Sequence, residues 1–398
     1  MGITLTKEQR YIVDDIKRTY RKGNQQVYEY GGGAGRGKSV VMACALYELG
    51  LPYSDTFPMS YTGAAACVMK TKGIYNARTI HSSLYETVKE KKMINGKPVK
   101  NEYFGTDEYE IKFIPREIPN NVKAFLIDEA PMTPKRMKAD IESRNKFIIA
   151  SGDLDQLPPV GDDPAYLTDI DNVKYLHEPM RQAWNSGIFY ISERARLGLP
   201  IHKGYYGNCI VIDEDDLTDE MLLSADVILT PRNERREQIN NYIRHDLLGF
   251  NTDIPMVGEH VICRKNNWLE EVEGINLVNG LMGVVTRQPG VLGYNGKSFS
   301  IDFKPNLIQS QFTGLNVDYK YFNAPYRLKK DMKNFRHDGE LFEYAYCISV
   351  HLSQGSEFSK VIYIEDYFNK NLQRNINYVA ASRAKDFLIW VKKKRRYY

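Results

Sequence analysis

Cysteine is scarce in this sequence. The 398 residues include five cysteines, which are scattered along the chain as Cys44, Cys67, Cys209, Cys263 and Cys347. No two of them form a C-x-x-C pair, which argues against a zinc site, an iron–sulfur cluster or a disulfide framework. We therefore expect five buried, unpaired thiols.

Long hydrophobic runs, repeats and low-complexity tracts are also missing. No window approaches the roughly 18 consecutive apolar residues of a membrane span, and the N-terminus MGITLTKEQR lacks the apolar core of a signal peptide. A net charge of +4 is too small to indicate nucleic-acid binding by itself. These absences predict a soluble, intracellular protein, and the length predicts at least two domains, since one domain usually holds about 100 to 200 residues.

Glycine is concentrated in one short stretch. Residues 31–39 read GGGAGRGKS, between the strand-like QVYEY and the helix-like VVMACALYEL, and they contain G-x-x-x-x-G-K-S. Glycines let backbone amides turn onto phosphate oxygens at the positive end of the following helix. The predicted phosphate-binding residues are Gly32, Gly33, Ala34, Gly35, Arg36, Gly37, Lys38 and Ser39.

Within this loop, Lys38 is expected to reach the β and γ phosphates of ATP and the Ser39 hydroxyl to bind Mg²⁺. Arg36 is unusual, because many such loops carry a small residue there. Its side chain either faces solvent or helps to neutralise phosphate, and the sequence does not decide between the two.

Acidic residues follow a second strand-like run, in NNVKAFLIDEAP. Asp128 is expected to hold Mg²⁺, and Glu129 to polarise the water that attacks the γ phosphate. A third run, KFIIASGDLDQLPPV, ends in two prolines that fix a rigid turn. That turn could hold Gln156 close to the γ phosphate.

The ordered set of motifs, from LTKEQ near the start to SRAK near the end, resembles the superfamily 1 helicases. Within them it is most similar to the Dda and RecD-like branch, called 1B, because of TGAAA, QLPPV and VHLSQGSEF. The resemblance implies that Gln9 recognises adenine and that Gln156 couples the γ phosphate to DNA movement. It further implies that Arg181 and Arg383 are the two arginines presented to the γ phosphate, and that Glu357 is the acid associated with the nucleotide.

The same resemblance implies single-stranded DNA contacts at Thr62, Gly63, Thr79, His81, His351, Ser353 and Gln354. For the two histidines, a packed or surface role is the alternative. Leu352 stands where the family usually has lysine, which removes one positive charge near the DNA or nucleotide path. Loss of one phosphate contact would weaken salt dependence rather than abolish binding.

We predict an α/β fold with two RecA-like parallel-sheet domains around a P-loop. The first would span residues 1–175, with a pin hairpin inserted at 84–116, and the second residues 176–249 and 343–398, with an SH3-like β-barrel inserted at 250–342. Asn95 and Gly96 give the hairpin signal. Tyr103 and Phe104 either meet the duplex junction by stacking or pack the hairpin onto its domain.

The sequence thus predicts an ATP-dependent DNA helicase that uses ATP and Mg²⁺ and, by resemblance, travels 5′ to 3′. The alternatives are an ATP-driven translocase that displaces proteins from single strands and a DNA-binding scaffold with a weak nucleotide site. The expected partners are single-stranded DNA and junctions of single- and double-stranded DNA, with a single-strand-binding or replisome protein as a further candidate. We expect a monomer of phage or plasmid origin in a bacterial cytoplasm, without membrane contact.

Overall fold

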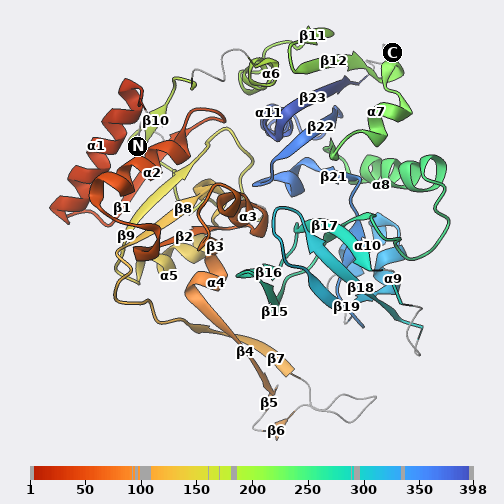
Figure 1. Cartoon of the computed structure of the whole chain (residues 1–398), viewed down its shortest axis with the longest axis horizontal. Helices are drawn as coiled ribbons and strands as arrows, with labels where there is room; N and C mark the ends of the chain where they lie inside the picture. The colour runs from red at the N-terminus through yellow and green to blue at the C-terminus, as the bar shows by residue number, and fades with distance from the viewer. Residues whose placement is uncertain are drawn as a thin grey trace.

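A computed structural model shows two α/β units and an inserted antiparallel sheet (Figure 1). It describes residues 4–91, 93–94, 97–98, 109–159, 161–169, 171–180, 186–287, 289–290, 296–332 and 337–393. The first unit lies at the left of Figure 1 in red to yellow, and the second lies at the upper right in green and blue. The predicted α/β class with two parallel sheets is confirmed, whereas the domain boundaries stay predictions.

The first unit is built on a six-stranded sheet in the order β10-β1-β9-β8-β2-β3, with every described pairing parallel. The strands are β1 (Val27–Gly32), β2 (Thr56–Ser60), β3 (Arg78–Thr79), β8 (Ala124–Asp128), β9 (Phe147–Gly152) and β10 (Lys174–Leu176). The helices are α1 (Lys7–Lys22), α2 (Lys38–Leu49), α3 (Gly63–Thr71), α4 (Ile80–Leu84) and α5 (Lys138–Glu142). Buried apolar runs such as Ala124–Ile127 are typical of a parallel sheet that is covered on both faces.

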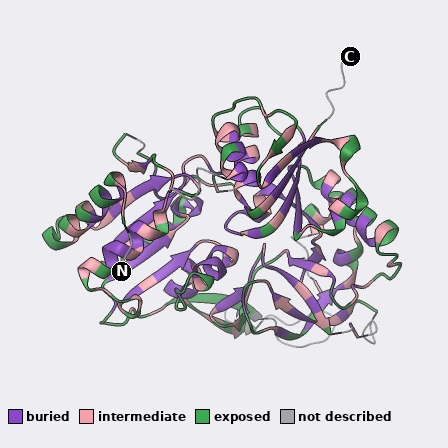
Figure 2. Cartoon of the chain, turned by 45° about the horizontal axis from the view of Figure 1, so that its top comes forward, coloured by how far each residue is buried: buried purple, intermediate pink, exposed green. Residues whose placement is uncertain are grey.

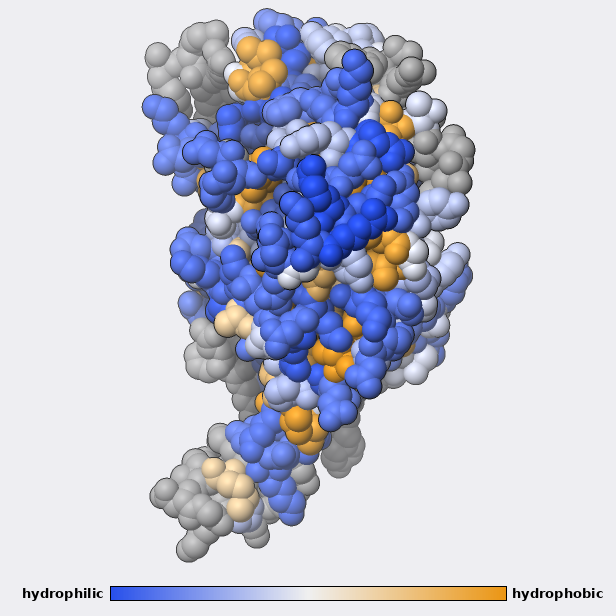
Figure 3. All heavy atoms as spheres, turned by 90° about the vertical axis from the view of Figure 1, so that its left-hand side faces the viewer, coloured by the Kyte–Doolittle hydropathy of each residue, from blue (hydrophilic) through white to orange (hydrophobic). Residues whose placement is uncertain are grey.

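A long hairpin projects from this unit at the bottom of Figure 1 and is seen from the side in Figure 3. Its strands β4 (Tyr85–Lys91) and β7 (Tyr109–Pro115) pair antiparallel, and β5 (Met93–Ile94) pairs with β6 (Lys97–Pro98) near its tip. The predicted turn residues Asn95 and Gly96 and the predicted wedge residues Tyr103 and Phe104 lie outside the described residues.

The second unit has a six-stranded sheet in the order β11-β12-β23-β22-β13-β21, parallel except for β11 and β12. The strands are β11 (Gly204–Tyr206), β12 (Cys209–Asp213), β13 (Val227–Thr230), β21 (Cys347–Ser349), β22 (Phe358–Ile364) and β23 (Ala384–Lys392). The helices are α6 (Gly187–Arg196), α7 (Asp219–Leu223), α8 (Asn233–Asn241), which continues as a π-helix (Tyr242–Leu247), and α11 (Gln373–Ser382). Its central strands are buried (Figure 2).

Between α8 and β21 the chain forms the inserted sheet, in the order β19-β18-β17-β14-β20. Its strands are β14 (His260–Cys263), β17 (Met282–Arg287), β18 (Ser298–Pro305), β19 (Phe312–Asp318) and β20 (Phe342–Tyr344), with a side hairpin of β15 (Asn267–Val272) and β16 (Ile275–Leu277) and the helices α9 (Tyr319–Asn323) and α10 (Tyr326–Met332). Ala66 and Cys67 of α3 belong to its apolar core. The insertion therefore packs against the first unit as well as the second, and β16 of the side hairpin makes this contact with α3 and β3.

The predicted burial of the cysteines is confirmed for all five. In the described ranges, no helix is both long enough and apolar enough to cross a membrane.

Candidate nucleotide and DNA sites

A cavity of about 650 Å³ lies where the two α/β units face each other. The first unit contributes the ends of β1, β8 and β9, because parallel strands place their carboxyl ends at one edge of the sheet. The second unit contributes α6 and the residues around β22 and β23. The predicted nucleotide residues that line the cavity are Gly33, Ala34, Gly35, Arg36, Gly37, Lys38, Ser39, Asp128, Glu129, Gln156, Glu357 and Arg383.

The glycine-rich loop joins β1 to α2, as predicted. Gly35 and Gly37 adopt φ values of 72° and 84°, a region that side chains with a Cβ rarely enter. The Lys38 ammonium donates hydrogen bonds to the carbonyls of Gly32, at 2.8 Å, and Gly33, at 3.4 Å. The loop is thus a compact turn at the N-terminus of a helix, a geometry that suits phosphate.

Glu129 directly follows β8 and has a left-handed backbone, with φ of 51°. Such a conformation is uncommon away from glycine and concentrates at functional sites. The Gln156 amide donates to Glu129 Oε1 at 3.3 Å. Burial raises the pKa of the Glu129 carboxyl, the Lys38 ammonium opposes that rise, and the Asp128 carboxylate adds to it. These contacts bring together the predicted base and the predicted coupling residue.

Ser39 and Asp128 line the same cavity. Asp128 Oδ1 accepts hydrogen bonds from the Glu129 backbone amide, at 3.1 Å, and the Ser151 hydroxyl, at 3.2 Å, which fix the carboxylate. A hydroxyl and a carboxylate are hard oxygen donors, so this pair fits Mg²⁺, which usually takes one or two carboxylates together with substrate phosphates.

Two predicted residues of the second unit face the first unit across the cavity. Arg383 is buried, and its guanidinium donates to the carbonyls of Val379 and Ser356, both at 3.2 Å. Glu357 forms an ion pair of 2.7 Å with Lys72 of the first unit, just beyond α3. Arg181 lies outside the described residues.

Gln9 and Gly32 do not line the cavity. Gln9 is buried, its Nε2 donates to the carbonyl of Arg36 at 3.2 Å, and its Oε1 accepts from the backbone amide of Thr6 at 3.0 Å. The glutamine therefore braces the loop and completes the capping box of α1. Gln9 thus lies against the phosphate loop, next to the cavity-lining residues Arg36 and Gly37.

For Arg36 the structure excludes one of the two alternatives that the sequence left open, a side chain that faces solvent, whereas its help in neutralising phosphate stays a prediction. Its side chain is neither solvent-exposed nor free, because it forms an ion pair of 2.7 Å with Glu193 of α6 and also donates to the carbonyl of His177. Only 5% of the side chain is exposed.

A second cavity, of about 270 Å³ and called the channel below because of its proposed role, is lined by residues of all three parts of the structure. Thr62, Gly63 and His81 line it from the first unit, and His351 and Gln354 line it from the second. Five of the predicted DNA-contacting residues therefore line the same cavity. Leu352, at the position of the family's lysine, also lines this channel.

Thr79 and Ser353 do not reach this channel. Both are buried; the Thr79 hydroxyl caps α4 by accepting from the Ser82 amide at 3.2 Å, and the Ser353 hydroxyl donates to the carbonyl of Val350 at 2.8 Å. The predicted DNA contact of these two hydroxyls does not fit their placement, because local backbone groups already occupy them.

Trp268 is a channel residue that the sequence reasoning missed. It lies in β15, and its ring centroid is 4.6 Å from that of His81 and 5.8 Å from that of Phe113 in β7. In the sequence Trp268 is a single tryptophan in a strand-like run, and such a residue could equally belong to a hydrophobic core. Only the fold shows that it meets the first unit's aromatic residues.

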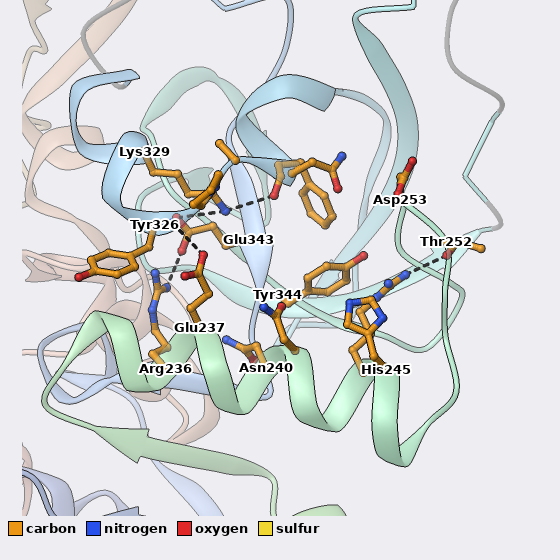
Figure 4. A pocket seen from close by; sticks show the side chains of 16 residues that line it. Arg236, Glu237, Asn240, His245, Thr252, Asp253, Tyr326, Lys329, Glu343 and Tyr344 are labelled. Carbon is orange, nitrogen blue, oxygen red and sulfur yellow. Dashed lines mark hydrogen bonds and ion pairs between the residues drawn. The ribbon is translucent and has the colours of Figure 1, made fainter.

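A third pocket, of about 390 Å³, lies between α8 and the inserted sheet (Figure 4). The buried Glu343 carboxylate lies between two cations there, with Arg236 at 2.5 Å and Lys329 at 3.9 Å. Arg264 adds a third cation at 3.3 Å. Burial alone would raise the pKa of Glu343, but Arg264, Arg236 and Lys329 hold it well below its usual range. This cluster joins the second unit to the insertion.

Comparison with known families and structures agrees with this arrangement. Residues 21–162 match the AAA domain, and residues 344–391 match the UvrD-like helicase C-terminal domain. A structure of two coordinating Pif1 helicases at forked double-stranded DNA is similar, with 17% identity, a TM-score of 0.54, and coverage of 98% of this chain and 92% of that chain. The chain has the fold of these Pif1 helicases.

Two further structures of this helicase fold are those of the Bacteroides Pif1 helicase. The complex with ADP-AlF3 and ssDNA is 16% identical, with a TM-score of 0.53, and the complex with ssDNA is 18% identical, with a TM-score of 0.52. Each comparison covers 98% of this chain and 92% of the other. The predicted helicase recognition is confirmed at the level of fold, and the two domain matches agree with the predicted class of ATP-dependent helicase.

Proposed function

We propose that this chain is an ATP-dependent DNA helicase that translocates 5′ to 3′ on single-stranded DNA and unwinds duplex DNA. One observation carries the proposal. A single cavity is lined by a phosphate loop and an acidic pair from one α/β unit and by Arg383 and Glu357 from the other. Hydrolysis at such a cavity would be sensitive to the relative position of the units, which is what a motor requires.

For catalysis, the amides of the glycine-rich loop and Lys38 would bind the β and γ phosphates of ATP. Mg²⁺, held by Ser39 and Asp128 together with phosphate oxygens, would neutralise developing charge. Glu129 would orient and deprotonate the attacking water, and Arg383 would stabilise the transferring phosphoryl group. Gln156, hydrogen-bonded to Glu129, would report the state of the γ phosphate.

The loop that carries Gln156 also reaches the DNA channel, because Pro158 and Pro159 line that channel. Its Leu157 carbonyl accepts a hydrogen bond of 2.8 Å from Gln354 of the second unit. The loss of the γ phosphate could therefore move this loop and, through it, the wall of the channel. The single-stranded DNA would lie along Thr62, His81 and His351 in that channel. Gln9 is the proposed contact to adenine, and Arg181 is a proposed contact to the γ phosphate. Mutation of each residue would test these roles.

Strand separation with defined tails tests the proposal. Duplexes with a 5′ or a 3′ single-stranded tail are incubated with ATP and Mg²⁺ and wild type, Lys38→Ala, or the control Lys203→Ala, whose lysine forms only surface ion pairs among described residues. Unwinding from the 5′ tail alone, lost in Lys38→Ala and kept in Lys203→Ala, supports the helicase. Preference for the 3′ tail contradicts the polarity, and DNA-stimulated ATPase without unwinding favours the translocase.

A second variant isolates the chemical step. Glu129→Gln is expected to lower the ATPase rate by about 10² to 10⁴, the usual contribution of a general base. Nucleotide binding should persist, because the phosphate loop is intact. Unchanged hydrolysis in Glu129→Gln would contradict the assignment.

Single-stranded DNA and junctions are the proposed partners, and the monomeric state, a single-strand-binding partner and the bacterial cytoplasm stay predictions.

A further inference from the structure

The phosphate loop is joined to the second unit by a largely buried ion pair. Arg36 Nη2 lies 2.7 Å from Glu193 Oε2, with the two side chains 5% and 19% exposed. Arg36 lies in the phosphate loop and Glu193 lies on α6, which packs on α11 and the second sheet. The pair therefore spans the boundary across which the proposed motor must close.

The same helix holds a second loop of the first unit. One turn along α6, Arg196 shares Glu193 at 2.8 Å and also pairs with Asp155 at 3.2 Å. Asp155 precedes Gln156 in the loop after β9, and Arg374 of α11 pairs with it at 3.3 Å. Alternating charges thus run from the phosphate loop through α6 to the loop that carries Gln156.

The Arg36 side chain lies along the loop instead of pointing to solvent. A Cβ added at Gly33 would lie 2.8 Å from Arg36 Nε, so only glycine leaves room for the side chain there. Burial would raise the pKa of Glu193, but hydrogen bonds from Arg196 and Arg36 hold it below its ordinary value. The carboxylate is therefore charged at neutral pH and available to both arginines.

We propose that Arg36 is a positioning residue, and that its ion pair with Glu193 couples closure of the two units to occupancy of the phosphate loop. The inference rests on the proposed function of ATP hydrolysis in this cavity. Arg36 acts through Glu193 and not on the phosphates, so the pair should affect the rate of hydrolysis in the closed state more than the binding of nucleotide to the loop.

The test compares Glu193→Gln, Arg36→Gln and the double variant with wild type. ATPase is measured with saturating single-stranded DNA and Mg²⁺, and the Kd for a fluorescent ADP is measured separately. Either single change should lower kcat at least about tenfold and change the Kd for ADP less than about threefold. The double variant should be no slower than Glu193→Gln, because Glu193→Gln already removes the ion pair with Arg36 in addition to the one with Arg196.

The matched control is Glu48→Gln. Like Glu193, Glu48 is shared by two cations, Arg10 at 2.6 Å and Lys17 at 2.6 Å, but all three residues lie in the first unit. The kcat of Glu48→Gln should match that of wild type. Arg36→Lys, which keeps the charge, should restore part of the rate lost in Arg36→Gln, and thermal melting of each variant should show one folded population.

The outcomes separate the two ideas. If wild type hydrolyses ATP and Glu193→Gln stays within about twofold of it, the positioning role is wrong. If Arg36→Gln instead weakens ADP binding more than tenfold while Glu193→Gln does not, Arg36 binds phosphate and the inference is also wrong. If wild type shows no ATPase with DNA, the proposed function fails and the inference falls with it. Should Glu193→Gln fail to fold, Glu193→Asp is used instead, because it keeps the charge but shortens the side chain. It should likewise lower kcat and leave the Kd for ADP nearly unchanged, and unchanged kcat would contradict the inference.

Discussion

The Tyr378 hydroxyl donates a hydrogen bond of 2.5 Å to Asp153 and accepts one of 2.8 Å from the backbone amide of Ala34. Tyr378 comes from α11 of the second unit, whereas Asp153 follows β9 and Ala34 lies in the phosphate loop. One fully buried phenol therefore joins two nucleotide-facing loops of the first unit to the second unit.

Tyr378→Phe should loosen this contact between the units. Removing the hydroxyl leaves a buried amide and a carboxylate oxygen without that partner, which costs about 1 to 3 kcal/mol. A pair of fluorescent labels, one on each unit, should report a longer mean distance. Tyr363→Phe is the control, because the Tyr363 hydroxyl bonds to Asn377 within the second unit, at 2.7 Å. Equal distances in both variants would contradict this role.

Trp268→Ala should weaken single-stranded DNA binding by about 1 to 3 kcal/mol, the value of one base stacked on an aromatic ring. Trp268 lines the channel and contacts the His81 ring, so its loss removes a stacking surface without touching the nucleotide cavity. Fluorescence anisotropy with an oligothymidylate measures the change. Trp268→Phe should keep most of the affinity, and an equal loss in both variants would indicate a purely structural role.

DNA affinity should be nearly independent of pH between 6 and 8. Burial, aided by the nearby Arg136 charge, lowers the pKa of His81 to about 4, and burial lowers that of His351 as well. Both shifts favour the uncharged imidazole at neutral pH, and His81 would gain charge only in acid. Binding titrations at pH 6, 7 and 8 in constant salt check this. A tightening at pH 6 that disappears in His81→Ala would show that the imidazole titrates in the ordinary range.

Glu343→Gln should destabilise the chain by about 3 to 5 kcal/mol, because it leaves buried cations without their shared carboxylate. The pKa of Glu343 is lowered in the folded state, so its stabilising contribution is present above the ordinary glutamate pKa of about 4.3 and is lost as the pH falls below it. Urea unfolding at pH 7 and pH 4 should show a smaller difference between wild type and variant at the lower pH. A constant difference would argue that Glu343 acts through packing alone.

Local sequence patterns predicted the nucleotide-binding elements well. β1, the glycine-rich loop and α2 are contiguous, and so are β8 and the acidic pair, so each could be predicted from one short stretch. The strands β14, β17 and β18 lie within residues 250–342, where the sequence predicted a β-rich insertion. The SH3-like character of the insertion is a finer prediction that the five-stranded order leaves open.

Long-range pairing could not be predicted in the same way. Arg36 and Glu193 are 157 positions apart, and nothing in either segment specifies the other. Thr79 and Ser353 carry motif positions of the family, yet their hydroxyls satisfy neighbouring backbone groups, a local competition that a motif does not display. The position of Trp268 beside His81 and Phe113 depends on how the insertion packs against the first unit, which the local sequence does not specify.

The contact between α3 and the insertion leaves no spare room at one position. An added Cβ at Gly63 would lie 2.6 Å from Val278, and both residues line the channel. The first unit and the insertion therefore touch at this edge of the channel. Any movement of the insertion away from α3 would widen the channel there, and a larger side chain at position 63 would force the two parts to separate.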